Sequence, residues 1–443
     1  MIEIIFTEAI FSNLKKALLN DNLESSAVLI ANPIPAIDKT RLVVTEVCMA
    51  MDPDYVVRGP ISAQLKPSFF APLAKQAKNN SQSLIFVHTH PHSEKKLYFS
   101  VIDDEGEKRL AKFLASRKIV QPHAAIVMSA KLVKARKLGT DENIKVIALG
   151  AHRSILHDPN LCEDHDFIYD RQVRAFGAEG QHILKTLTVG IVGLGGTGSI
   201  VAEQLTHLGV RNFLLIDPDV IEKTNLNRVV GAKASDVGAK KISVATRHIL
   251  SINPSVTVKE TFGSVLDAKT AQLLADTDLF FCCTDSHGSR AVLNQLAYQY
   301  FVPCIDLGVS IAAEKNHVSR VIGRVQMLSP GLGCLACSNL LNADLVRYDL
   351  MSSYERQQDP YFIGSALPEP AVISINSTVS SLAVTMFLSA VVGIPSDARY
   401  QIYNGIEGIV RSIDLPQNPN CIVCSKRGAL GRGTEWPLPA RQI

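Results

Sequence analysis

Two histidines and an aspartate form the first residue set in this chain that is suited to a catalytic metal. His88 and His90 close an apolar run, and Asp103 follows at the start of a helical pattern. Because side chains alternate along a strand, both imidazoles project from one side of an extended segment. Two imidazoles and one carboxylate are a zinc ligand set that leaves a fourth position for a water. The carboxylate of Glu24 is the candidate base for a proton from that water.

A glycine-rich loop, Gly193-Leu194-Gly195-Gly196-Thr197-Gly198, follows another apolar run. A loop of this kind lets the backbone approach a phosphate and directs the N–H groups of the next helix at the anion. Asp217, which closes the next apolar run, is the residue type that binds a ribose hydroxyl. Dinucleotide oxidoreductases share these features, so an NAD-dependent oxidoreductase stays an alternative at this point.

The polar residues beyond Asp217 favour ATP over NAD. Two cations, Arg228 and Lys241, and one carboxylate, Asp285, follow in turn. Hydride transfer needs no such cluster beside the phosphates. ATP chemistry does, because cations stabilise charge developing at the α-phosphate and a carboxylate holds magnesium. The predicted cofactors of this half are therefore ATP and Mg²⁺.

Four of the nine cysteines form two C-x-x-C pairs, Cys334-Leu335-Ala336-Cys337 and Cys421-Ile422-Val423-Cys424. Four thiolates make a closed tetrahedral zinc site, which is structural because no coordination position stays open. Redox-active pairs are the alternative, but two pairs in one chain favour zinc. This use of cysteine fits a reducing compartment, so we expect a cytoplasmic protein.

The composition fits a folded protein of two or three domains. The 443 residues are 47% hydrophobic and 20% charged, which supplies apolar material for packed cores. A net charge of +3 without a basic stripe gives no sign of nucleic-acid binding. The apolar residues 371–394 include several serines, so we expect a buried helix rather than a membrane span. No secretory signal is visible at the start of the chain.

The first half of the chain must place the two histidines on a sheet. We assign residues 1–150 to one domain, with a helix over 103–117. Residues 151–166 are polar and lack periodicity, which predicts a solvated linker rather than a metal site. Strands of this domain are predicted over residues 41–47, 83–88, 123–129 and 143–149.

The second half alternates buried strands with helices, which predicts an α/β fold with a Rossmann-like, doubly wound, mainly parallel sheet. We assign residues 167–430 to this domain and residues 431–443 to a C-terminal tail. The predicted strands cover residues 187–193, 212–216, 279–283 and 302–306, and the predicted helices cover residues 197–208, 240–252 and 289–300.

From residue 169 to the second cysteine pair, the chain resembles the ThiF/MoeB superfamily, the adenylating core of ubiquitin-activating enzymes. The resemblance rests on the opening motif Tyr169-Asp170-Arg171-Gln172, on the glycine loop and on the motifs that follow it. It implies that Asp217 binds ribose and that Asp285 binds magnesium. It also implies a homodimer in which Arg171 reaches into the neighbouring protomer's site. The residues implied to hold the phosphates are Asn225, Arg228 and Lys241.

Members of that superfamily that form a thioester carry a cysteine between the two zinc pairs. Residues 338–420 contain none, so the chain resembles the members that stop at the adenylate. Cys282, Cys283 and Cys304 fall on or near predicted core strands, where a buried thiol is the ordinary interpretation. Cys48 and Cys162 are expected to lie outside the core.

Residues 1–150 resemble the JAB/MPN metalloproteases, whose JAMM motif here comprises Glu24, His88-Thr89-His90-Pro91, Ser100 and Asp103. The resemblance implies that His88, His90 and Asp103 bind zinc. It also implies that Glu24 is the base and that Ser100 supports the oxyanion. The interval from His90 to Ser100 is longer than is usual in the family, which a loop insertion would absorb. His92 is left out of the ligand set, because Pro91 breaks the strand before it.

Together the two resemblances predict an enzyme that adenylates the C-terminal glycine of a ubiquitin-like or sulfur-carrier protein. The first domain would trim or release the same protein with zinc. This pairing suggests a prokaryotic ubiquitin-like conjugation or sulfur-transfer system, with a homodimer and a separate conjugating enzyme as further expectations. A non-catalytic scaffold with an inactive first domain is the other alternative. No nucleic-acid or membrane partner is expected.

Overall fold

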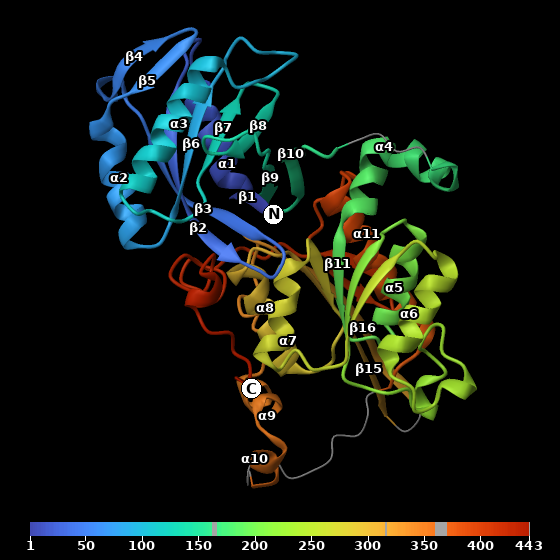
Figure 1. The fold of residues 1–443 in the computed structure, drawn as a ribbon. Helices are drawn as coiled ribbons and strands as arrows, with labels where there is room; N and C mark the ends of the chain where they lie inside the picture. Colours follow the sequence, from blue (N-terminus) through green and yellow to red (C-terminus); the bar gives the residue numbers. More distant parts are fainter. Residues whose placement is uncertain (162–165, 315–316, 359–369, 443) are drawn as a thin grey trace. The chain divides into compact units, whose positions relative to one another are not determined.

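The computed structural model describes residues 1–161, 166–314, 317–358 and 370–442, which form two compact units (Figure 1). The first unit contains Met1–Leu161 and Gly431–Glu435, and the second contains Cys162–Leu430 and Trp436–Ile443. Each unit has its own eight-stranded sheet among the described residues. The residues predicted for each chemistry thus belong to separate units.

The sheet of the first unit is mixed, in the order β10-β9-β1-β3-β2-β6-β7-β8. The pairs β9–β1, β1–β3 and β6–β7 are parallel, and the remaining neighbours are antiparallel. The four predicted strands correspond to β3, β6, β7 and β9. The strands are β1 (Ile2–Thr7), β2 (Ser26–Pro35), β3 (Thr40–Met49), β6 (Ser83–Thr89), β7 (Ala124–Met128), β8 (Val133–Lys137), β9 (Lys145–Leu149) and β10 (Arg153–His157).

Helices pack on both faces of this sheet, and strand alternation divides its apolar residues between two cores. On β2, Leu29 faces the core that contains α1, whereas Val28 and Ile30 face the core that contains α2 and α3. On β6, Phe86 also faces the second core, so His88 projects from the same face of the strand. The elements are α1 (Glu8–Leu18), α2 (Pro67–Asn79), α3 (Val101–Ser116), η1 (Asp52–Asp54) and a separate hairpin of β4 (Tyr55–Gly59) and β5 (Ser62–Leu65).

The prediction that residues 151–166 form a linker is wrong for the first part of this segment, because Arg153–His157 form β10. This strand pairs antiparallel with β9, and a bulge interrupts the pairing between Ile155 and His157. β10 is an edge strand, so it has one paired neighbour, and its bulge disrupts the period-2 pattern on which the sequence prediction relied. Residues 162–165 of the predicted linker lie outside the described residues.

The sheet of the second unit has the order β13-β12-β11-β14-β15-β16-β17-β18. The strands from β13 to β15 are parallel, and those from β15 to β18 form an antiparallel meander. The predicted Rossmann-like sheet is thus confirmed and is extended by the meander. Its strands are β11 (Thr188–Val192), β12 (Asn212–Ile216), β13 (Thr257–Thr261), β14 (Leu279–Cys282), β15 (Cys304–Glu314), β16 (His317–Leu328), β17 (Tyr400–Asn404) and β18 (Ile409–Ser412).

Helices cover both faces of the second sheet. α5, α6 and α11 form one layer, and α7 and α8 pack on the other side (Figure 1). The helices are α4 (Asp170–Thr186), α5 (Gly198–His207), α6 (Lys241–Ile252), α7 (Ala268–Gln272), α8 (His287–Gln299), α9 (Ala343–Leu350), α10 (Ser353–Gln358) and α11 (Ile373–Val391). The 3₁₀ turns are η2 (Phe167–Tyr169), η3 (Lys223–Asn225), η4 (Ala234–Asp236), η5 (Leu273–Asp276) and η6 (Gly433–Glu435).

Within the apolar residues 371–394, Ile373–Val391 form α11. Within the described part of the chain, it is the one helix whose length and hydropathy would suit a membrane span. It instead packs against α5, β15 and β16, with Val379, Ala383 and Phe387 almost fully buried. These contacts agree with the predicted buried helix.

Candidate active sites

The glycine loop after β11 lies against the turn that follows β14. Gly193 has a φ of +87°, which side chains rarely tolerate. A Cβ atom on Gly193 would lie 2.8 Å from the carbonyl oxygen of Cys283, and one on Gly198 would overlap the carbonyl oxygen of Gly193. β11 and β14 flank the point at which the strand order reverses, where open α/β sheets bind ligands. The loop therefore presents its backbone and the start of α5 to a bound phosphate.

Asp217, which follows β12, is hydrogen-bonded to the backbone of this loop. The residue is 3% exposed. Its Oδ2 accepts a hydrogen bond from the N–H of Leu194 at 2.6 Å, and its Oδ1 accepts one from the N–H of Asp219 at 2.7 Å. Burial raises the pKa of the Asp217 carboxyl, and the hydrogen bond from Leu194 opposes that rise. This position at the end of the second parallel strand suits a carboxylate that binds ribose.

Arg228 and Asn225 lie in one turn beside the glycine loop. The Asn225 side chain is buried, and its Oδ1 accepts a hydrogen bond from the N–H of Glu222 at 3.1 Å, which stabilises the turn. The aliphatic part of Arg228 passes Gly196 so closely that a Cβ there would lie 3.3 Å from Arg228 Cδ. The guanidinium donates from Nη1 to the carbonyl of Thr224 at 2.6 Å and has further donors for a phosphate.

Lys241 begins α6 and reaches the same turn as Asp217. Its Nζ donates to Asp219 Oδ2 at 2.8 Å. Nζ of the preceding Lys240 instead lies 4.4 Å from the centre of the Phe262 ring. The structure therefore brings Lys241, rather than Lys240, to the candidate nucleotide site.

Asp285 is exposed on the turn between β14 and α8. Arg290, in α8, fastens this turn by donating from Nη2 to the carbonyl of Thr284 at 2.8 Å. The Arg290 guanidinium also donates from Nη1 to the fully buried Asp306 at 3.0 Å, and Arg324 donates to the same carboxylate. Burial would raise the pKa of Asp306, but the two arginines lower it. Sequence analysis missed Arg290 and Asp306, because only the fold places them under the turn that carries Asp285.

Arg171 lies in the exposed first part of α4. A kink at Phe176 and Gly177, where φ of Gly177 is +79°, separates this part from the rest of the helix. Among the described residues, no ion pair with Arg171 is found. The exposure of Arg171 is compatible with the predicted contact to a neighbouring protomer.

The four predicted zinc ligands meet in the second unit. Each of Cys334, Cys337, Cys421 and Cys424 places its sulfur within 4.8 Å of the other three. The Cys334–Cys421 and Cys337–Cys424 sulfur distances are both 3.5 Å. Tetrahedral zinc with Zn–S bonds of about 2.3 Å requires sulfurs at about this separation. The hydrogen bond from Cys424 lowers the pKa of Cys334, which favours a thiolate there. The donor set therefore fits a structural zinc ion.

The remaining cysteines do not join this cluster. Cys282 and Cys304 are fully buried, as predicted, and Cys283 is half-buried beside the glycine loop. Cys48 is half-buried at the margin of the second core of the first unit, against which it packs without being one of its buried members. Cys162 lies outside the described residues.

We expect Cys334→Ser to remove one zinc ion per chain and to destabilise the second unit, because metal binding is coupled to folding. The melting temperature should fall by about 5 °C or more, since a loss of a few kcal/mol shifts a domain of this size by several degrees. Metal analysis by mass spectrometry and a thermal melt would measure both effects. Cys48→Ser, which changes a thiol outside the tetrad, should keep the full zinc content. Unchanged zinc and melting temperature in Cys334→Ser would contradict the assignment.

The predicted histidines and aspartate of the first unit also meet. His88, His90 and Asp103 place ligand atoms within 4.8 Å of one another. His88 Nε2 lies 3.3 Å from Asp103 Oδ1, and His90 Nε2 lies 3.8 Å from Asp103 Oδ2. The three side chains are half-buried and converge from the end of β6 and the start of α3. This donor set fits a zinc ion that keeps one position open.

Glu24 lies beside this cluster, just before β2. Its Oε1 is 3.7 Å from His90 Nε2, and burial raises the pKa of its carboxyl. The N–H of Glu24 donates to the carbonyl of Gly59 at 2.8 Å, which ties the residue to the β4–β5 hairpin. Arg58 of that hairpin donates to Ser25 Oγ at 2.7 Å. The backbone thus holds the carboxylate within reach of an atom bound between the histidines.

Ser100 lines the pocket beside the metal cluster, and its backbone N–H and its hydroxyl both bond to Asp103. As the N-cap of α3, its hydroxyl accepts from the N–H of Asp103 at 3.2 Å and donates to Asp103 Oδ2 at 2.8 Å. The N–H of Ser100 donates to the same oxygen at 2.6 Å. These bonds orient the carboxylate toward His88. Oxyanion support by Ser100 remains a prediction and would require its hydroxyl to turn from Asp103.

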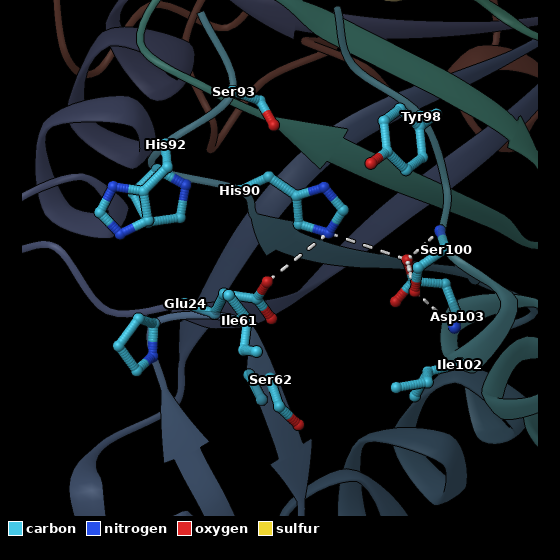
Figure 2. A pocket seen from close by; sticks show the side chains of 13 residues that line it. Glu24, Ile61, Ser62, His90, His92, Ser93, Tyr98, Ser100, Ile102 and Asp103 are labelled. Carbon is cyan, nitrogen blue, oxygen red and sulfur yellow. Dashed lines mark hydrogen bonds and ion pairs between the residues drawn. The ribbon is translucent and has the colours of Figure 1, made fainter.

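The metal cluster opens into a pocket whose other wall is the turn between β4 and β5 (Figure 2). Ile61, 84% exposed, and Ser62 line this wall. His92 and Tyr98 line the opposite side, from the loop that connects His90 to α3. That loop contains no helix or strand. Its extra residues do not move Asp103 away from the histidines. Sequence analysis missed the hairpin wall, since no motif marks it.

The second unit matches a known family. The model of the ThiF family matches residues 169–423, which is more than half of the chain. The molybdopterin-synthase adenylyltransferase of Escherichia coli K12 is 28% identical over 270 residues, which cover 60% of this chain and 99% of that protein. The ubiquitin-like modifier-activating enzyme 5 of Oryza sativa subsp. japonica is 26% identical over 262 residues, which cover 54% of this chain and 56% of that protein. The chain thus spans nearly all of the first relative and about half of the second.

Solved structures give a more distant match. The E. coli MccB structure with ATP has 23% sequence identity and a TM-score of 0.47, and the match covers 59% of this chain and 76% of that chain. A similarity at this level does not bear on the chemistry of the site.

Proposed function

We propose, because this chain belongs to the ThiF family, that its second unit uses ATP to adenylate the C-terminal glycine of a ubiquitin-like or sulfur-carrier protein. The observation that carries the proposal is that Asp217 and Arg228 contact the glycine loop. Lys241 reaches the turn that bears Asp217, and Asp285 lies on the turn that adjoins the loop. The names of the two relatives agree with it, since one is an adenylyltransferase and the other activates a ubiquitin-like modifier.

In the proposed reaction, a carboxylate oxygen of the carrier's terminal glycine attacks the α-phosphorus of ATP. The bond from that phosphorus to the bridging oxygen breaks, and pyrophosphate leaves. Asp217 binds the ribose, and the loop N–H groups together with Asn225, Arg228 and Lys241 bind the phosphates. Lys241 would exchange its ion pair with Asp219 for one with a phosphate. Magnesium held by Asp285 would neutralise charge on the departing oxygens.

Pyrophosphate exchange tests the proposal. Wild-type protein mixed with small ubiquitin-fold proteins that end in Gly-Gly should exchange labelled pyrophosphate into ATP with at least one of them. An NAD-dependent oxidoreductase would instead bind NAD and show no exchange, as would a non-catalytic scaffold. Calorimetric titration with Mg–ATP and with NAD separates these alternatives without a carrier.

We further propose a homodimer in which Arg171 acts on the partner's nucleotide, which its exposed position supports. Arg171→Ala and Asp285→Ala should each lose exchange. In a mixed dimer one of the two sites would regain both residues, so a random mixture should recover about a quarter of the wild-type rate. Exchange assays on co-refolded chains would measure this recovery. No recovery in verified mixed dimers would indicate that Arg171 acts within its own chain.

For the first unit we propose a zinc metalloprotease of the JAB/MPN type. The specific observation is the meeting of His88, His90 and Asp103 beside the carboxylate of Glu24. Zinc bound by these ligands would lower the pKa of a water. Glu24 would take the proton from that water and pass it to the leaving amine. Arg58 and the carbonyl of Gly59 hold the segment that bears Glu24.

The substrate proposed for the first unit is the same carrier protein, extended beyond its terminal glycine or linked to a target. Cleavage would expose the glycine carboxylate that the second unit activates. Both reactions require a site that accepts an extended Gly-rich tail. On this proposal the protein acts in the cytoplasm and hands the activated carrier to a separate conjugating enzyme or sulfur donor.

A further inference from the structure

α11 packs directly on the glycine loop of the second unit. Ser380 in this helix donates from Oγ to the carbonyl of Thr197 at 3.2 Å, and Gln204 of α5 donates to Ser381 Oγ at 2.8 Å. Figure 1 shows α11 beside α5, and the two helices are in contact. Asn376 lies one helical turn before Ser380, so both side chains project from the same face of α11.

The Asn376 amide points at Gly196, in the middle of the loop. A Cβ atom on Gly196 would overlap Asn376 Nδ2, and it would also lie 3.3 Å from Arg228 Cγ and Cδ. The amide and the arginine thus approach the same glycine from two different elements. A side chain at position 196 would displace both of them, which gives a physical reason for glycine there.

The Asn376 side chain has no hydrogen-bond partner within residues 1–161, 166–314, 317–358 and 370–442, although the residue is only 4% exposed. Two neighbouring polar side chains of α11 have backbone partners. Ser377 donates to the carbonyl of Ile373, and Thr378 donates to the carbonyl of Ser374. Buried amides are normally satisfied, because an unpaired buried polar group costs free energy. An amide that points at a phosphate loop and has no partner among the described residues is suited to bind a ligand atom there.

We propose that Asn376 is a further nucleotide-binding residue, which donates from Nδ2 to a phosphate oxygen of ATP beside Gly196. The inference rests on the proposed adenylation function. A phosphate oxygen fits because the atom nearest Gly196 is a donor, and because Arg228 and the loop N–H groups direct positive charge to the same place. A bound phosphate would give the Asn376 amide the partner that the described residues do not supply.

Titration calorimetry with Mg–ATP on the full chain tests this inference. Asn376→Ala should weaken ATP binding by about tenfold, since hydrogen bonds to charged groups contribute more than neutral ones. Asn376→Asp should weaken it further, because it replaces the donor with a negative charge beside the phosphates. Thr378→Ala, an exposed change on the same helix, should bind ATP as the wild type does. Without ATP, the melting temperature of Asn376→Ala should not fall, because the Asn376 side chain makes no hydrogen bond within the described residues.

Each outcome separates this inference from the proposed function. If the wild type binds no Mg–ATP, the adenylation proposal fails and the inference fails with it. If the wild type binds Mg–ATP and Asn376→Ala binds equally well, only the inference fails. A lower melting temperature of ligand-free Asn376→Ala with unchanged ATP affinity would assign Asn376 a packing role. An increase in KM for the carrier alone would overturn the assignment to a phosphate oxygen.

Discussion

Asp285→Ala should lose pyrophosphate exchange by about 10²–10³-fold, the typical cost of removing one preorganised group that stabilises a transition-state charge. Asp285 is exposed on the turn after β14, and the backbone of that turn lies against Gly193. Asp285 therefore lies on a turn at the carboxyl ends of β11 and β14, where phosphates are expected. Its removal should leave that turn intact, because Arg290 holds the carbonyl of Thr284 from within the fold.

The measurement is exchange of labelled pyrophosphate with a carrier that supports the wild-type reaction, repeated over a range of Mg²⁺ concentrations. Asp285→Asn, which keeps the shape of the side chain, should also be impaired and should need more Mg²⁺. Asp414→Ala removes an exposed carboxylate beyond the edge strand β18 and is the matched control. Wild-type exchange by Asp285→Ala at limiting Mg²⁺ would remove this residue from the metal site.

Local patterns were sufficient to predict much of the second unit. The strands that precede Gly193, Asp217 and Asp285 are short, apolar and buried, so their ends could be predicted from the sequence. The order of polar residues after each strand then predicted a candidate nucleotide site, because parallel strands place their carboxyl ends at one edge. Cysteine spacing likewise predicted a tetrad whose two pairs are separated by more than eighty residues of sequence.

The parts that could not be predicted depend on contacts between distant segments. Asn376 lies in an apolar helix, and only the packing of α11 on the glycine loop directs its amide at Gly196. Arg290 resembles any helix cation until the fold brings it to Thr284 and Asp306. No sequence motif marks the β4–β5 wall of the metal pocket, because the hairpin turn lines the pocket without supplying a reactive group.

Ser100 shows a different reason for an incomplete prediction. Its residue type and its spacing from Asp103 fit the motif, yet the ligand-free hydroxyl is bonded to Asp103. A serine before a helix caps that helix by the same chemistry that could serve an oxyanion. The presence of a serine at position 100 therefore does not determine whether it caps the helix or supports an oxyanion.

Glu24→Gln should keep zinc and lose cleavage by about 10²–10⁴-fold, the usual contribution of a general acid–base group. The amide has the shape of the carboxylate but cannot take a proton. Zinc should remain, because His88, His90 and Asp103 supply the ligands without Glu24. His88→Ala should lose both zinc and cleavage. Both variants should still exchange pyrophosphate, since the nucleotide site belongs to the other unit.

The assay offers zinc-loaded protein a carrier extended beyond its terminal glycine and follows the released peptide by mass spectrometry. Glu105→Gln, an exposed change on the helix that carries Asp103, should cleave as the wild type does. Cleavage that survives in Glu24→Gln would remove Glu24 from the mechanism. If zinc-loaded wild type cleaves none of several extended carriers, the first unit is not a protease of these substrates. Its pocket beside Ile61 and Tyr98 would then serve to hold the carrier.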